Sequence, residues 1–223
     1  MIFDPSYLVI MVVGLVLGLV TQAWIKGSYR KWSRVPLATG RSGAEVARAM
    51  LDQNGLSEVR ISQIGGSLTD NYDPRTRVLN LSADVYNGRS VASAGVAAHE
   101  AGHAVQHARA YAPAAARQAL VPIANIGSQI SWLLIMVGFW LNFGGLITIG
   151  ALVFGGAVLF QIVTLPVEFD ASHRAVEALS MGLPPEQAAG ARSVLNAAAM
   201  TYVAAALVAI MQFAYFLGLS RRN

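Results

Sequence analysis

The sequence predicts a mainly α-helical protein that crosses a membrane about four times and carries a small α+β portion outside the bilayer. First, 55% of its 223 residues are hydrophobic and only 13% are charged, which is too apolar for an ordinary soluble domain. Second, three stretches contain no charged residue at all: 5–25, 118–167 and 193–220. Third, residues 26–117 form the one sizeable polar segment.

The uncharged stretches define the expected membrane spans. Spans at 5–25 and 194–219 each match the roughly 20 apolar residues that cross a bilayer. The middle stretch is too long for one span, so we expect it to fold back at 142–145. This gives two further spans, at 121–141 and 146–165.

These stretches have two alternative interpretations. They could be buried helices of a soluble core, but such helices rarely exceed 20 residues without a charge. The first stretch could be a cleaved signal peptide. It lacks a basic region before it and is followed by Lys26, Arg30, Lys31 and Arg34, which favours a retained signal-anchor.

The basic residues predict the orientation in the membrane. Fourteen of the sixteen Lys and Arg residues lie between the first and second spans or between the third and fourth. The positive-inside rule then places both connections in the cytoplasm and both termini outside. Arg221 and Arg222, which follow the last span, are weak evidence against this orientation. The net charge of +4 is therefore explained by membrane topology. We expect the protein to have a lipid bilayer as its partner and to bind no nucleic acid. The chain has no cysteine, which excludes disulfide and thiolate chemistry.

The polar segment should hold a helix followed by short strands. A helix is expected over 42–54, where a capping serine is followed three residues later by a glutamate. Strand pieces are expected at 59–61 and 66–69, and a turn at 70–76. Residues 77–82 alternate apolar and polar, which predicts a half-buried strand.

An alanine-rich helix is expected from Ser90 to about Ala110. After the membrane hairpin, 167–192 should contain a helix ending near Gly182 and a connector in which Pro184 and Pro185 open the last helix. We expect residues 1–223 to form a single unit, because no repeat or low-complexity linker interrupts them.

The alanine-rich helix carries the motif His99-Glu100-Ala101-Gly102-His103, of the HExxH type. Residues four apart lie on the same face of a helix, so His99 and His103 can bind one metal ion. Glu100 lies beside that face and can accept a proton from a metal-bound water. The alternative is a polar stripe on a helix.

A catalytic zinc site usually needs a third protein ligand. Position 109 would be histidine in the metzincin pattern but is Arg109 here. His107 would lie about 12 Å along the helix axis from His99, too far to share one ion, so it is expected near the site or at the surface. Glu168 remains, because a hairpin of two spans returns the chain to the membrane face of His99 and His103. Its alternative role is an interfacial acid that marks the end of a span. All four histidines, including His173, lie in these two segments.

The stretch AAHEAGHAVQ at 97–106, with LPVEFDAS at 165–172, resembles the YugP-like family of membrane zinc metallopeptidases. LTDNYDP at 68–74 and VLNLS at 78–82 resemble it too, so the likeness covers nearly the whole chain.

This resemblance implies a gluzincin-type site with one zinc ion per chain. Its ligands would be His99, His103 and Glu168, with Glu100 as general base. A more distant similarity links the chain to HtpX-like and CAAX-prenyl membrane endopeptidases. They have an acid four positions after the ligand glutamate, where this chain has Ser172.

Further roles near the site are expected from flanking residues. Asp170 is the candidate for an acid that braces the ligands in place of the missing one. The negatively charged oxygen that forms when the peptide carbonyl is attacked (the oxyanion) needs a hydrogen-bond donor. The candidates for this donor are His173, Arg174 and Tyr72. The alternative for each of them is an ordinary surface role. An extended substrate could add to the edge of the strand that contains Val78, Leu79, Asn80 and Leu81, unless this strand is merely half of a hairpin.

The expected function is that of a zinc endopeptidase of a bacterial cell membrane, with its active site facing the cytoplasm and a peptide or membrane protein as substrate. A zinc-binding scaffold without turnover is the alternative, although such a site has no use for Glu100. A transporter is weaker, because apart from Glu168 near one interface the spans contain no charge. Small residues in the spans are compatible with homo-oligomers.

Overall fold

The structure is a computed structural model that describes residues 4–221. In chain order, its elements are α1 (Pro5–Trp32), α2 (Gly43–Gln53), β1 (Arg60–Ile64), β2 (Asn71–Asp73), β3 (Val78–Ser82), α3 (Ala83–Tyr86), α4 (Val91–Ala108), α5 (Ala112–Trp140), α6 (Gly144–Ser180) and α7 (Pro185–Ser220). Arg222, one of the two C-terminal basic residues, lies outside the described residues.

Four helices among the described residues are long and apolar enough to cross a membrane: α1, α5, α6 and α7. The predicted class, a mainly α-helical polytopic membrane protein, is confirmed. Each helix is longer than the span that was expected there. In particular, α6 continues through Pro166 to Ser180, so Glu168 lies on the same helix as the third span.

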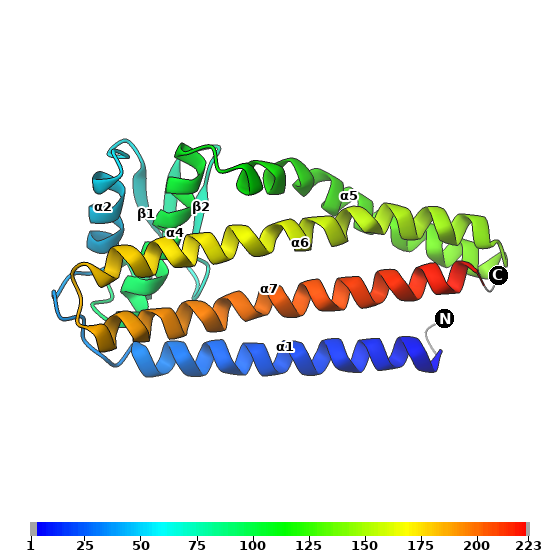
Figure 1. Ribbon diagram of the computed structural model, residues 1–223, viewed down its shortest axis with the longest axis horizontal. Helices are drawn as coiled ribbons and strands as arrows, with labels where there is room; N and C mark the ends of the chain where they lie inside the picture. Colours follow the sequence, from blue (N-terminus) through cyan, green and yellow to red (C-terminus); the bar gives the residue numbers. More distant parts are fainter. Residues whose placement is uncertain (1–3, 222–223) are drawn as a thin grey trace. The chain divides into compact units, whose positions relative to one another are not determined.

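The predicted fold-back between the second and third spans is confirmed. Helix α5 ends at Trp140 and α6 begins at Gly144, and the two form a hairpin (Figure 1). Asn142 has a φ of 52°, a left-handed conformation that asparagine tolerates better than most residues. The two helices approach closely, because a Cβ added at Gly138 would lie 2.9 Å from the backbone nitrogen of Ile147.

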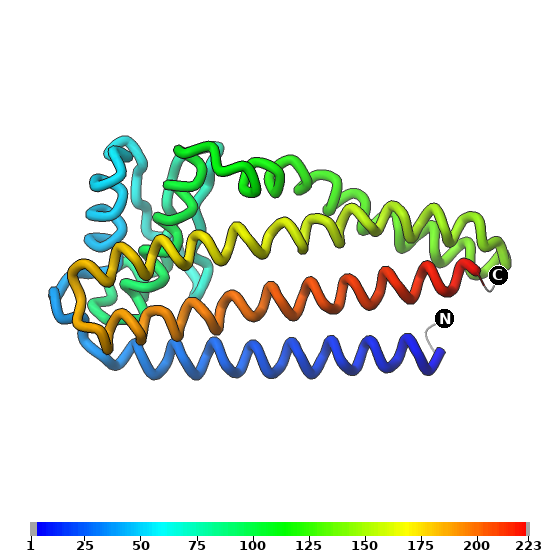
Figure 2. The backbone as a smooth tube through the Cα atoms, in the orientation of Figure 1, coloured from blue at the N-terminus to red at the C-terminus, as the bar shows by residue number. Residues whose placement is uncertain are grey.

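The chain divides into two compact units. The first, here called the helical unit, contains the described residues of 1–21, 113–166 and 200–223. The second, here called the mixed unit, contains residues 22–112 and 167–199. The continuous tube in Figure 2 shows that α6 and α7 are unbroken helices, and each contributes residues to both units. The expectation that residues 1–223 act as a single metallopeptidase unit stays a prediction.

The mixed unit contains a three-stranded sheet in the order β1-β3-β2. β2 and β3 form the expected antiparallel hairpin, whereas β1 pairs with β3 in parallel. The strand predicted at 66–69 is wrong. The strand lies at β2, inside the predicted turn, because the Asp73 carboxylate accepts hydrogen bonds from Arg75 and Thr76 and so moves the turn beyond it.

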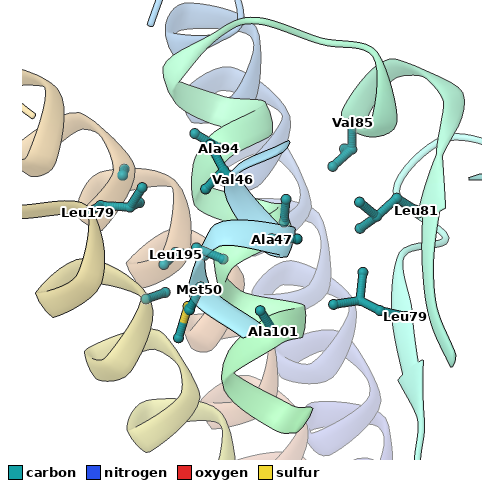
Figure 3. Close-up of a cluster of buried hydrophobic side chains, with 14 of the residues drawn as sticks. Val46, Ala47, Met50, Leu79, Leu81, Val85, Ala94, Ala101, Leu179 and Leu195 are labelled. Carbon is teal, nitrogen blue, oxygen red and sulfur yellow. The ribbon is translucent and has the colours of Figure 1, made fainter. Parts of the chain in front are cut away.

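The core of the mixed unit joins the sheet to the helix that carries the metal motif. Figure 3 shows Leu79 and Leu81 of β3 and Ala101 of α4 among its buried side chains. Helix α2 packs here after starting at a capping box of Ser42 and Glu45, as predicted. This packing holds α4 in a fixed place, and α4 positions the candidate site.

Candidate metal centre

Helix α4 presents the two histidines of the motif on one face. It starts at Ser90, whose side chain caps the backbone N–H of Ser93. His99 and His103 then lie one turn apart, with ring centroids 4.7 Å apart in an edge-on arrangement. Alanine on the remaining faces of α4 lets neighbouring elements approach, and most of the helix is buried.

Glu168 reaches the two histidines from α6. Its carboxylate oxygen Oε2 lies 3.2 Å from Nε2 of His99 and 3.7 Å from Nε2 of His103. Glu168 is only 2% exposed, so it is a buried acid rather than a surface marker of the end of a span. The structure therefore brings together the three residues that were expected to be ligands.

The three side chains fit a zinc ion. One nitrogen or oxygen from each of them lies within 4.8 Å of the other two. Four ligands placed tetrahedrally around zinc at about 2.1 Å are roughly 3.4 Å apart, close to the separations of Glu168 from the two histidines. Two imidazoles and one carboxylate also form a donor set typical of catalytic zinc, which leaves a fourth position for water.

A glycine inside the motif allows α4 and α6 to approach. A Cβ added at Gly102 would lie 2.8 Å from the carbonyl oxygen of Ala171, so any larger residue would push the two helices apart. This role of Gly102 was not predicted from the sequence. A glycine between the two histidines of an alanine-rich helix does indicate a place where another backbone approaches.

Glu100 lies beside the ligands and is itself buried, at 9% exposure. Its charge acts on the His103 imidazole. Burial by itself lowers the pKa of His103, but the hydrogen-bonding contact with Glu168 and the negative charges of Glu100 and Glu168 outweigh it, so the pKa is raised. The site thus favours positive charge, as a centre for a divalent cation should.

A hydrogen-bonded chain supports His103 from behind. Its Nδ1 lies 3.0 Å from Oε1 of Gln106, whose Nε2 donates to the Asp170 carboxylate at 2.8 Å. Arg174 donates to the same carboxylate at 2.6 Å. Asp170 was expected to brace the ligands, and it touches them only through Gln106. Gln106 was not predicted as a site residue, although its spacing of three residues from His103 places the two side chains on the same face of α4.

Ser172 lies behind the other histidine. Its Oγ is 3.1 Å from Nδ1 of His99. The hydroxyl therefore occupies the place where distant relatives were expected to have an acid. Its position, four residues after Glu168 on α6, puts it on the face of α6 that meets α4.

The remaining predicted residues are Tyr72, His107, His173 and Arg174, and all but His173 have a side-chain partner near the site. The Tyr72 hydroxyl lies 3.0 Å from Nδ1 of the exposed His107, one turn beyond His103 on α4, and burial raises the pKa of Tyr72. His173, in contrast, is exposed. Arg174 is engaged with Asp170 and thus with the support of the ligands.

The expectation that substrate adds to the edge of β3 is wrong. β3 is the middle strand, paired with β1 along its whole length and with β2 at Val78, Leu79 and Asn80. Both sides of its backbone are therefore occupied over most of its length. Leu79 and Leu81 are fully buried in the core, so the alternating pattern reports packing rather than substrate binding.

Comparison with known proteins agrees with this site. A family described as "putative neutral zinc metallopeptidase" matches residues 7–221. The curated relative "Putative membrane protease YugP" of Bacillus subtilis (strain 168) is 44% identical over 194 residues, which cover 86% of each chain. No solved structure matches the chain. The chain therefore belongs to this family of "putative neutral zinc metallopeptidase" proteins, as its motifs at 97–106 and 165–172 predicted.

Proposed function

We propose that this protein is an integral membrane endopeptidase that holds one zinc ion per chain through His99, His103 and Glu168. The observation that carries the proposal is the convergence of these three side chains beside Glu100, a buried carboxylate that is not needed as a ligand. The proposed substrate is a peptide or a membrane protein.

The chemistry divides between the metal and Glu100. A bound zinc ion would lower the pKa of a water molecule and polarise the peptide carbonyl. Glu100 would serve as the proton carrier: it would accept a proton from the attacking water and would then deliver that proton to the leaving amine. Because Glu100 is buried, its carboxylate is screened little by solvent, which strengthens its action on a nearby proton.

For the oxyanion, the contacts favour Tyr72 over the other two candidates. Its hydroxyl is oriented by His107, next to the motif on α4. Arg174 instead donates two hydrogen bonds to Asp170, at 2.6 and 3.2 Å, and would have to give these up. We therefore propose Tyr72 as the donor.

The critical experiment removes the general base and leaves the ligands intact. The full chain, purified in detergent, should cleave a peptide library, and a zinc chelator should stop the cleavage. Glu100→Gln should retain zinc by elemental analysis but lose at least about 100-fold in turnover, because an amide cannot accept the proton. Glu177→Gln, an exposed change on α6, is the matched control.

The outcomes separate the endopeptidase from a zinc-binding scaffold. Unchanged cleavage by Glu100→Gln would eliminate the proposed mechanism. A wild-type chain that binds zinc and cleaves nothing in the library, with or without chelator, would instead support the scaffold.

We also propose that the site faces the cytoplasm of a bacterial cell. This rests on the positive-inside rule, since the basic residues gather in the two connections between spans. A reporter inserted at Gly55, in the turn after α2, should give a cytoplasmic signal. A signal from outside the membrane would reverse the orientation.

A further inference from the structure

We infer that Gln106 is a positioning residue that sets the tautomer of His103 and directs its Nε2 toward the metal. The inference rests on the metal site of the proposed function. It gives a role to a buried amide that neither the motif nor the family description assigns.

Gln106 has a partner at each polar atom of its side chain. It is 1% exposed and follows His103 by three residues on α4. Its Nε2 lies 2.8 Å from the carbonyl oxygen of Val167 and 2.8 Å from the carboxylate of Asp170. Its Oε1 lies 3.0 Å from Nδ1 of His103.

These partners determine which way the amide points. The Val167 carbonyl and the Asp170 carboxylate are both hydrogen-bond acceptors, so only the NH₂ end of Gln106 can face them. A reversed amide would place its own oxygen against these two oxygens and would lose both hydrogen bonds. The Oε1 end must therefore face His103.

The orientation of Gln106 in turn determines the tautomer of His103. An amide oxygen carries no hydrogen, so Nδ1 of His103 must be the donor in this contact. A neutral imidazole has one N–H, and its other nitrogen then has a free lone pair. That nitrogen is Nε2, which faces Glu168 at 3.7 Å, on the side of the predicted metal.

The anchor of this chain lies on α6. Arg174 holds the Asp170 carboxylate with two hydrogen bonds, and Asp170 and Val167 both lie within two residues of Glu168. Gln106 thus links a ligand on α4 to the segment that carries the third ligand. His99 lacks such a constraint at its partner Ser172, because a hydroxyl can donate or accept.

The test measures metal binding rather than turnover. We would titrate the purified full-length protein with Zn²⁺ against a competing chelator and record the visible spectrum of the Co²⁺ form, which reports ligand geometry. Gln106→Met preserves length and removes the polar atoms. It should weaken zinc affinity about 10- to 100-fold and alter the Co²⁺ spectrum, as expected when the partner of a metal-bound histidine is removed.

The control is Gln187→Met, which removes another bridging amide of the mixed unit. Gln187 bonds the backbone of Ala38 and Pro36, away from the ligands. It should leave zinc affinity and the Co²⁺ spectrum unchanged. Wild-type affinity and spectrum in Gln106→Met, or equal losses in both variants, would overturn the inference.

A second variant covers the case in which Gln106→Met does not fold. Asp170→Ala removes one of the two acceptors that orient the amide at a half-buried position, and should lower zinc affinity by a smaller factor and alter the spectrum. A folded Asp170→Ala protein with wild-type affinity and spectrum would refute the role of Gln106. A wild-type chain that binds zinc but cleaves nothing would remove the proposed endopeptidase and leave this inference standing.

Discussion

The helical unit and the mixed unit differ in which side chains they bury and which they expose. In the helical unit, large apolar side chains face outward, for example Leu15 at 63% and Leu133 at 64% exposure. In the mixed unit, Leu79 and Leu81 are fully buried, and the acids Glu100 and Glu168 are buried as well. A bilayer can cover exposed leucine, but a buried carboxylate needs a local partner.

The comparison is sharpest along α6, which belongs to both units. Up to Pro166 this helix contains no charge, and within the next eight residues it contains Glu168, Asp170 and Arg174. The polar residues of the candidate site therefore begin where the apolar stretch of α6 ends, without any break in the helix.

The largest effect should come from the acid on α6. Glu168→Ala removes a metal ligand, and we expect zinc affinity to fall by more than about 100-fold, beyond the effect of losing a partner of a ligand. Elemental analysis of the purified protein measures bound zinc. Glu177→Ala, an exposed acid on the same helix, should keep its zinc. Full metal occupancy in Glu168→Ala would remove Glu168 from the site.

A matched pair of leucines tests the two kinds of environment. Leu79→Ala opens a cavity in the core of the mixed unit and should lower the free energy of unfolding by about 2–5 kcal/mol. Leu15→Ala in the helical unit should change it by less than about 0.5 kcal/mol, because that side chain is mostly exposed. Denaturant unfolding in detergent, followed by circular dichroism, measures both. Equal losses would contradict the division into two environments.

A matched pair of glycines tests the approach of α4 to α6. Gly102→Ala should destabilise the protein by about 1–3 kcal/mol, because the added methyl meets the Ala171 carbonyl. Gly18→Ala in α1 has open space and should be neutral or stabilising, since alanine is the better helix former. The same unfolding measurement serves for both. A stabilised Gly102→Ala protein would show that the two helices need not approach so closely.

The smallest effect should come from Ser172. Ser172→Ala removes the hydroxyl behind His99, and we expect zinc affinity to fall by about 10-fold or less, since this hydroxyl does not by itself set a tautomer. Chelator competition measures the affinity, with Ser180→Ala on the same helix as the control. A larger loss than that of Gln106→Met would reverse the proposed order of the two supports.

Local signals were sufficient wherever a few neighbouring residues decide the outcome. The capping box at Ser42 and Glu45, the fold-back at Asn142 and the pairing of His99 with His103 depend on spacing within one or two turns, and all three are present in the structure. Glu168 lies far from the histidines in the chain, and it could be predicted only because the uncharged stretch is long enough for two spans. Two spans return the chain to the membrane face of His99 and His103, so hydropathy alone indicated that these residues lie near one another.

The failures occurred where two distant segments decide together. A strand was predicted at 66–69, but residues 71–73 form it, because they are the ones that pair with β3. Alternation in 77–82 correctly predicted a strand but did not reveal that strands flank it on both sides. A pattern of side chains reports burial, whereas the position of a strand within a sheet depends on its partners.

The sequence by itself determined the membrane class and the metal motif, and it predicted that Glu168 would lie beside that motif, because hydropathy and helical spacing can be read directly along the chain. Only the tertiary structure decided how the ligands are held. The amide of Gln106 is oriented by Val167 and Asp170, which are 61 and 64 residues away in the chain. A hydrogen bond depends on distance and direction in space, and those exist only once α4 and α6 have packed together.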